Sequence, residues 1–265
     1  MFDRLKSMFG RTPVVSERDY AMPANVRAYA IGDIHGEAGL LRDLLDRIVE
    51  DCERLPQAEI HLVFLGDYID RGPDSKGVVE LLTQYRSLDT NFHFLKGNHE
   101  DAMLAIIDGN EDDLPGWLRF GGRQTLASYG ISERAIAMGG PFLRAEFAEK
   151  VPPHHLAFLT DLKLSVELGD YLFVHAGIRP GVPIDQQDER DLMWIRREFM
   201  TFVGSHPKMI VHGHTISEHV ELMPNRIGVD TGAYASGILS AVALEGSGRR
   251  VLSVSSGRNG AQQLA

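Results

Sequence analysis

Short apolar runs alternate with longer amphipathic stretches along the first hundred residues. Residues 27–31, 60–65 and 91–95 are apolar runs of strand length, each followed within a few positions by glycine. Between them, apolar residues recur at helical spacing over 40–49 and 78–85, as in helices that bury one face. This alternation predicts an α/β chain, or one with layered α+β architecture.

The rest of the chain changes character twice. Residues 110–162 predict mostly helix, interrupted by the glycine pairs at 121–122 and 139–140. With no internal repeat or low-complexity linker, we expect an N-terminal tail over 1–22 and a single domain over 23–265, with 110–162 inserted in it. The last third returns to apolar runs that predict strands at 164–168, 171–175, 209–211, 227–229, 238–244 and 251–254.

Composition narrows the choice of partners and location. The 265 residues include 27 Lys and Arg against 37 Asp and Glu, a formal charge of −10, which argues against a nucleic-acid partner. The sequence lacks an apolar run of about 18 residues, so we expect no stable membrane insertion. The only cysteine, Cys52, cannot form an internal disulfide. The first residues of the sequence lack the apolar core of a secretion signal. We therefore expect a cytoplasmic protein.

Five predicted strand ends carry glycine within two positions of a residue that can bind metal. Ligands of open α/β sheets bind outside the carboxyl ends of strands. A single Gly-Asp after a strand is usually only a turn, but coincidence explains five such sites in one chain poorly. The segments are Gly-Asp-Ile-His-Gly at 32–36, Gly-Asp-Tyr-Ile-Asp-Arg-Gly at 66–72, Gly-Asn-His-Glu at 97–100, His-Ala-Gly at 175–177 and Gly-His-Thr at 213–215.

The donor atoms in these segments are carboxylate oxygens, imidazole nitrogens and an amide oxygen. This mixture suits manganese, iron or zinc better than calcium or magnesium. Six ligands are too many for one four-coordinate zinc, but they suit two metals that share a carboxylate, the arrangement used to cleave phosphate esters. The six are Asp33, His35, Asp67, Asn98, His175 and His214.

These blocks resemble the signature blocks of calcineurin-like metallophosphoesterases. The Asp-Arg-Gly and Asn-His-Glu forms resemble the phosphoprotein phosphatase branch, with its bacterial serine/threonine protein phosphatases and dinucleoside tetraphosphatases, and Asp230-Thr231-Gly232 resembles a further element of the bacterial group. The resemblance implies two packed mixed β-sheets flanked by helices, the metallophosphoesterase-type sandwich, with the metal site at the strand ends.

The resemblance also implies how the ligands divide. Asp33 and His35 would hold the first of two divalent ions and Asp67 would bridge both. We expect manganese, with iron or zinc as alternatives. His212 is a rival for the last position, since it lies two residues before the expected ligand. The second ion would be held by Asn98, His175 and His214.

The resemblance assigns chemistry to the neighbouring residues. A bridging hydroxide would attack phosphorus, and His99 would donate a proton to the leaving oxygen while Asp70 orients it. Arg71 would bind phosphoryl oxygens, and Asn98 would add a hydrogen bond. A second phosphate-binding arginine is expected at Arg196, with Arg197 and Arg179 as alternatives.

The expected function is a serine/threonine protein phosphatase that hydrolyses phosphomonoesters. One alternative is a bis(5'-nucleosyl)-tetraphosphatase, with the same metals and different substrate walls. Another is a binding protein that keeps the fold without turnover. The substrate would be a phosphorylated protein or a small phosphoester, and 110–162 would line its cleft. The sequence leaves the oligomeric state open.

Overall fold

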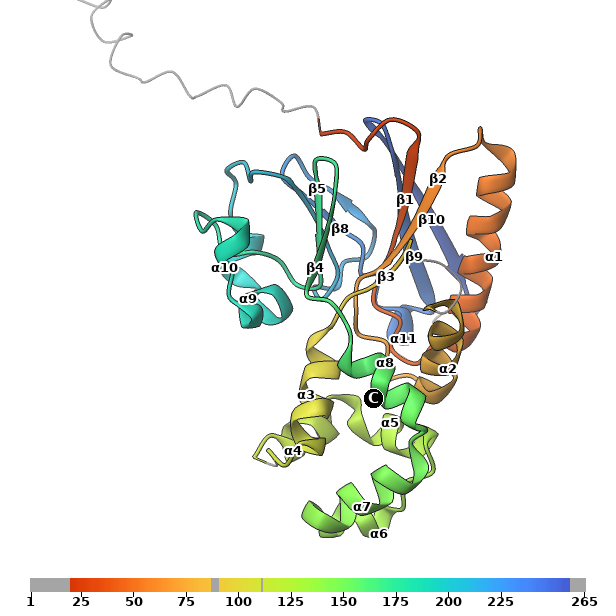
Figure 1. The fold of residues 1–265 in the computed structure, drawn as a ribbon, viewed down its shortest axis with the longest axis vertical. Coiled ribbons are helices and arrows are strands. Elements are labelled where there is room, and N and C mark those ends of the chain that lie inside the picture. The colour runs from red at the N-terminus through yellow and green to blue at the C-terminus, as the bar shows by residue number, and fades with distance from the viewer. Residues whose placement is uncertain (1–19, 87–90, 111, 258–265) are drawn as a thin grey trace, which may run out of the picture.

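Two five-stranded mixed sheets pack face to face in the computed structural model, which describes residues 20–86, 91–110 and 112–257 (Figure 1). The first sheet has the order β10-β9-β1-β2-β3 and the second has β4-β5-β6-β8-β7. This confirms the expected layered α/β sandwich. The first sheet contains β1 (Val26–Ile31), β2 (Glu59–Phe64), β3 (Phe92–Phe94), β9 (Ile238–Glu245) and β10 (Gly248–Ser255). The second contains β4 (Ser165–Leu168), β5 (Tyr171–Val174), β6 (Met209–His212), β7 (Glu221–Leu222) and β8 (Arg226–Gly228).

Each sheet has three neighbouring parallel strands at its centre or edge. Strand β2 pairs in parallel with β1 and β3, and β6 pairs in parallel with β5 and β8. The carboxyl ends of parallel neighbours lie at one edge of their sheet. Each sheet therefore offers three adjacent strand ends from which loops can present side chains.

The strands alternate their buried side chains between an inner and an outer core. Ala28 and Ala30 of β1 face the core between the sheets, together with Phe173 of β5. Tyr29 of β1 faces the outer core of the first sheet, and Leu172 of β5 faces that of the second. Both sheets are therefore buried on both faces, which explains why these strands read as nearly continuous apolar runs.

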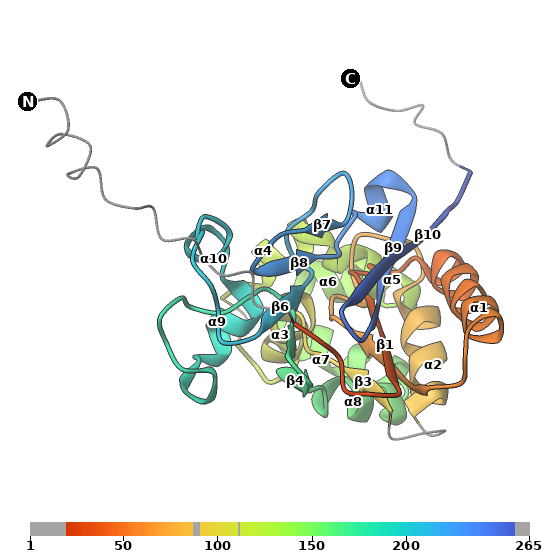
Figure 2. The same ribbon diagram turned by 90° about the horizontal axis from the view of Figure 1, so that it is seen from above.

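Helices cover the two outer faces (Figures 1 and 2). Helices α1 (Ala38–Arg54) and α2 (Ser75–Arg86) lie over the first sheet, with Leu41 and Leu44 buried in its outer core. Helices α9 (Glu189–Trp194) and α10 (Arg197–Met200) lie over the second, where Phe199 is fully buried.

The stretch 110–162 is a group of short helices below the sheets in Figure 1. Its place as an insertion that lines the cleft stays a prediction. The elements here are α4 (Leu114–Trp117), the π-helical turn η1 (Leu118–Gly122), α5 (Arg123–Ser128), α6 (Glu133–Met138), α7 (Gly140–Lys150) and α8 (Pro153–Thr160). The remaining elements are α3 (Asn98–Ile107), η2 (Ile184–Gln186) and α11 (Ala233–Ser236).

The expected tail over 1–22 lies mostly outside the described residues. Of its last residues, Tyr20 and Met22 are buried in the core between the sheets, and the Met22 N–H donates to the carbonyl of Gly246. Among the helices of the described residues, none combines the length and the apolar character that crossing a membrane requires.

Candidate active site

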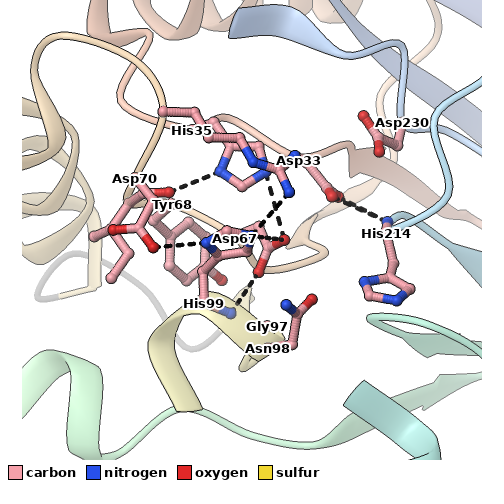
Figure 3. A network of polar contacts seen from close by, with 12 residues as sticks. Asp33, His35, Asp67, Tyr68, Asp70, Gly97, Asn98, His99, His214 and Asp230 are labelled. Carbon is pink, nitrogen blue, oxygen red and sulfur yellow. Dashed lines mark hydrogen bonds and ion pairs between the residues drawn. The ribbon is translucent and has the colours of Figure 1, made fainter. Parts of the chain in front are cut away.

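The strand ends of both sheets bring the six predicted metal ligands together. Figure 3 labels five of them, all except His175. The first sheet supplies Asp67, whose carboxylate lies 3.5 Å from Nε2 of His35 and 3.5 Å from Nε2 of His175. His175, from the second sheet, lies 3.0 Å from Oδ1 of Asn98 and 3.2 Å from Nδ1 of His214. The remaining ligand, Asp33, accepts the backbone N–H of His214 at 3.0 Å.

Two of the imidazoles are oriented by backbone carbonyls behind them. His35 Nδ1 donates to the carbonyl of Ile69 at 2.7 Å, and His175 Nδ1 donates to that of Leu65 at 2.8 Å. The Nε2 lone pairs therefore face the site, as in metal-binding histidines whose other nitrogen is held by the protein. Nε2 of His35 is buried and has no hydrogen-bond partner, so its lone pair is available to bind a metal ion.

The electrostatics of the site fit divalent cations. Burial lowers the pKa of His35 to about 3 and that of His214 to about 2, so both rings are neutral near pH 7, as metal ligands must be. Burial, together with Asp230 and Asp67, raises the pKa of Asp33 well above its usual range. Among the six predicted ligands, the buried carboxylates have only neutral imidazoles and an amide beside them, and bound metal ions would supply the balancing positive charge.

The backbone is left-handed at five site residues. In the described part of the chain, only one other non-glycine residue, Asn25, has positive φ. Such a conformation is unfavourable for residues with a Cβ and gathers at functional sites, where the surroundings enforce it. The five are His35 (φ 45°), Asp67 (φ 51°), Asp70 (φ 73°), Arg71 (φ 65°) and His214 (φ 62°).

Two glycines are required by close approach. A Cβ on Gly97 would overlap the carboxylate of Asp67, and one on Gly213 would overlap that of Asp33. These are the glycines of Gly-Asn-His-Glu and Gly-His-Thr. They let each turn come into contact with a carboxylate from another strand end.

The structure places His99 and Asp70 in direct contact. His99 Nδ1 donates to Oδ2 of Asp70 at 2.6 Å (Figure 3). Its Nε2 lies 3.0 Å from Nη2 of Arg71. Burial opposes a charge on His99, but the carboxylates of Asp67 and Asp70 outweigh it and raise its pKa above the ordinary value. His99 therefore differs from the histidines predicted as ligands, because its neighbouring carboxylates raise its pKa whereas burial lowers theirs.

The predicted alternatives separate in space. Arg196 donates from Nε to Nε2 of His214 at 2.9 Å and so reaches the site. Arg179 instead forms an exposed ion pair with Asp191 at 2.6 Å. His212, the rival of His214, packs its ring edge-on against Phe199 with 5.0 Å between centroids. In the described residues it belongs to neither of the two ligand groups that gather around Asp67.

Glu100 is a site residue that sequence reasoning passed over. Its buried carboxylate accepts backbone N–H groups of Asp67 at 2.9 Å and Tyr68 at 2.8 Å through its two oxygens. It accepts Ile69 at 3.3 Å and Gly97 at 2.9 Å as well. Glu100 thus ties the turn after β2 to the turn after β3. The only sequence feature that could have pointed to Glu100 was its position at the end of the Gly-Asn-His-Glu motif, in which it had been assigned no role.

Two residues of the Asp230-Thr231-Gly232 region also border the site. Asp230 is buried, and burial raises its pKa to about 6. Tyr234 lies edge-on to His35, with 5.4 Å between ring centroids, and beneath the Arg71 guanidinium, which is 4.8 Å from the Tyr234 ring centre. Only the resemblance of the motif pointed to this region, and it assigned no role to either side chain.

Two mixed sheets with His, Asp and Asn at adjoining strand ends define a metal-dependent hydrolase. The family model of the calcineurin-like phosphoesterases matches residues 26–227. Because this is well over half of the chain, the protein belongs to the calcineurin-like phosphoesterase family. It is accordingly a metallophosphoesterase, and divalent metal ions are the cofactors of this class.

The chain is similar both to a protein phosphatase and to a dinucleoside tetraphosphatase. Serine/threonine-protein phosphatase 2 of Escherichia coli K12 is 28% identical over 223 residues, which cover 80% of this chain and 90% of that protein. The symmetrical bis(5'-nucleosyl)-tetraphosphatase of Janthinobacterium sp. strain Marseille is 33% identical over 152 residues, 57% of this chain and 44% of that one. A solved structure described as a candidate diadenosine tetraphosphatase shares the fold, with a TM-score of 0.60, 23% identity, and coverage of 90% of this chain and all of that one.

Proposed function

We propose that this chain is a serine/threonine protein phosphatase that removes phosphate from phosphorylated proteins. The observation that carries the proposal is the similarity to E. coli serine/threonine-protein phosphatase 2 over 80% of this chain and 90% of that protein. The contact between His99 and Asp70 supports it, because a serine or threonine alkoxide needs a proton to leave.

The proposed metal centre uses the six clustered ligands. A mixed oxygen and nitrogen donor set favours manganese, with iron or zinc as alternatives. When bound, two such ions supply an activated water nucleophile and stabilise charge on the phosphoryl oxygens. The proposed division places Asp33 and His35 on one ion, Asp67 between both, and the second ion on Asn98, His175 and His214.

The arginines would bind and orient the phosphoryl group. The Arg71 guanidinium lies beside His99, and that of Arg196 beside His214, so the two approach the ligand cluster from different strand ends. Guanidinium groups bind phosphoryl oxygens through paired hydrogen bonds and match the charge of the transition state. The side-chain amide of Asn98 would add a hydrogen bond to the same group.

Proton transfer to the leaving group would come from His99. As the bond between phosphorus and the serine oxygen breaks, that oxygen takes the proton from His99 Nε2, and the ring becomes neutral. The Asp70 carboxylate holds Nδ1 and so fixes which nitrogen faces the substrate. General acid catalysis of this kind contributes about 10²–10⁴-fold to the rate.

The second candidate is a bis(5'-nucleosyl)-tetraphosphatase. The observation that favours it is the 33% identity to the Janthinobacterium enzyme over 152 residues. Both candidates would use the same metal ligands, so the substrate walls decide between them. We propose that 110–162 forms such a wall, since the Arg71 N–H donates to the carbonyl of Gly121 in this stretch at 3.3 Å.

The free thiol of Cys52 suits the reducing cytoplasm in which we place the enzyme.

A panel of three substrates tests the proposal. The manganese-loaded protein is given a phosphoserine peptide, diadenosine tetraphosphate and p-nitrophenyl phosphate, and kcat/KM is measured for each. The proposal expects the peptide to be preferred over the dinucleotide. The reverse preference would establish the second candidate. Failure on all three would indicate a protein that keeps the fold without turnover.

A further inference from the structure

The Asp70 carboxylate is held by more than His99. Oδ2 accepts the indole N–H of Trp117 at 2.7 Å in addition to His99 Nδ1 at 2.6 Å. Oδ1 accepts the hydroxyl of Thr125 at 2.5 Å. Asp70 is fully buried, so these three donors replace the water that an exposed carboxylate would bind.

Both additional donors come from the helices that follow α3. Trp117 ends α4 and is 5% exposed, and Thr125 lies in α5 and is fully buried. Gly122 is packed so closely against the Trp117 indole that a Cβ there would overlap the ring. The indole therefore has little freedom to turn away from Asp70.

The same helices hold the backbone of the turn. The Thr125 hydroxyl accepts the Asp70 N–H at 2.8 Å while it donates to the Asp70 carboxylate, so both functions of one hydroxyl are used on one residue. The next N–H, that of Arg71, donates to the carbonyl of Gly121. Asp70 and Arg71 are both left-handed, and these contacts help to enforce that conformation.

We propose that Trp117 and Thr125 are positioning residues for the proton donor, acting on His99 through the carboxylate of Asp70. This inference rests on the proposed function. Three donors fix the rotation of the carboxylate, and the fixed carboxylate sets the direction of His99 Nε2. Small errors in such an alignment are costly, because proton transfer requires the donor within hydrogen-bond reach of the leaving oxygen. The insertion is then part of the catalytic apparatus as well as a wall of the cleft.

Removing single donors tests the proposal by their effect on different leaving groups. Trp117→Phe removes only the indole N–H and its fused ring, and Thr125→Val removes the hydroxyl. Each is expected to lower kcat for the phosphoserine peptide about 10-fold or more while p-nitrophenyl phosphate, whose leaving group needs no proton, loses less than about 3-fold. KM should stay unchanged. Thr125→Ser should restore activity, and Arg47→Gln, an exposed change in α1 outside 110–162, should have no effect.

A double-variant cycle separates positioning from general damage. If Trp117 acts through Asp70, then Trp117→Phe should cost nothing further in an Asp70→Asn background. An equal cost in both backgrounds, or equal losses on both substrates, would overturn the inference. A wild-type protein that releases no phosphate from the peptide would overturn the proposed function first.

A spectroscopic measurement tests the contact without activity. The chain has two tryptophans, so two indole N–H signals are expected in a ¹H–¹⁵N spectrum of the protein loaded with a diamagnetic ion such as zinc. Trp117→Phe identifies one of them. Asp70→Asn should shift that signal, because the charged acceptor is lost, and should leave the signal of Trp194 in place. A Trp117 signal that ignores Asp70→Asn would contradict the contact on which the inference depends.

Discussion

His175 Nε2 lies 3.2 Å from Nδ1 of His214, although 39 positions separate the two residues in the chain. The register of the second sheet explains this proximity. Phe173 of β5 pairs with Val211 of β6, and the next contact along the same two strands is the bond from the Gly213 N–H to the carbonyl of His175. Two parallel strands that end in register therefore deliver two imidazoles to one point, and the same rule delivers the ligands of the first sheet.

Replacing Asp67 with Asn should remove metal and turnover together. The Asp67 carboxylate lies between His35 and His175, and an amide neither carries its charge nor bridges two cations well. We expect metal affinity and kcat to fall by at least about 100-fold each. Metal content by elemental analysis and kcat with saturating manganese check this. Retention of both would remove the bridging role.

Replacing His99 with Asn should affect alkyl phosphates more than aryl phosphates. The variant loses the proton donor, and a phenolate leaves without one. We expect kcat for the phosphoserine peptide to drop about 10²–10⁴-fold, with a much smaller loss for p-nitrophenyl phosphate. Equal losses on the two substrates would count against an acid role for His99.

Arg196→Ala should weaken substrate binding and turnover, whereas Arg179→Ala should change neither. Arg196 contacts His214 within the ligand cluster, while Arg179 is committed to Asp191 on the surface. For Arg196→Ala, we expect KM for the peptide to rise and kcat to fall by about 10-fold each. Steady-state kinetics of the two variants, measured side by side, check this. Similar losses in both would make the assignment of Arg196 wrong.

Glu100→Gln should destabilise the fold. Both oxygens of Glu100 accept backbone N–H groups, so an NH₂ group in either position would face donors, and part of the bonding would be lost. We expect the free energy of unfolding to fall by about 2–4 kcal/mol in urea titrations. The matched control is Glu149→Gln, an exposed change that should stay within about 0.5 kcal/mol. A Glu100→Gln protein as stable as wild type would show that this carboxylate does not hold the two turns.

Stability should fall as the pH drops from 6.5 toward 4, in part because of His206. Burial, with a smaller effect of Arg226, lowers the pKa of His206 to about 4. Between its folded and unfolded pKa values, the unfolded state binds more protons, so acid favours unfolding. This group alone should remove about 2 kcal/mol between pH 7 and pH 5. Urea titrations at both pH values should show a smaller pH effect in His206→Phe, which keeps an aromatic ring between Phe199 and Phe202. An identical pH effect would contradict the prediction.

The clustering of the six predicted ligands was predictable because each of them follows a strand end in a short local pattern. Apolar runs located most strands within a residue or two, and glycine marked the turns. The two-residue strand β7 was missed, because Glu221–Leu222 is too short to carry a period. These parts of the fold depend on neighbours in sequence, so sequence reasoning reached them.

The supports of the site were not predictable for a different reason. Trp117 and Thr125 meet Asp70 across 47 and 55 residues, and nothing local marks either one as its partner. Tyr234 reaches Arg71 only because β9 returns beside β1. A buried carboxylate implies donors, but only the packing of the helices decides which side chains they are.

The left-handed backbone at five site residues means that selection for stability should act differently on these positions, depending on whether activity is also required. Glycine at any of these positions would relieve about 1 kcal/mol of conformational cost, but it would also delete the functional group. A laboratory selection for heat resistance should therefore collect changes in the sheets and covering helices and leave these five alone. A selection for stability alone, without a requirement for activity, should allow glycine to replace these five residues. The residues found at these five positions would then distinguish active variants from variants that have lost activity among the sequenced products of such selections.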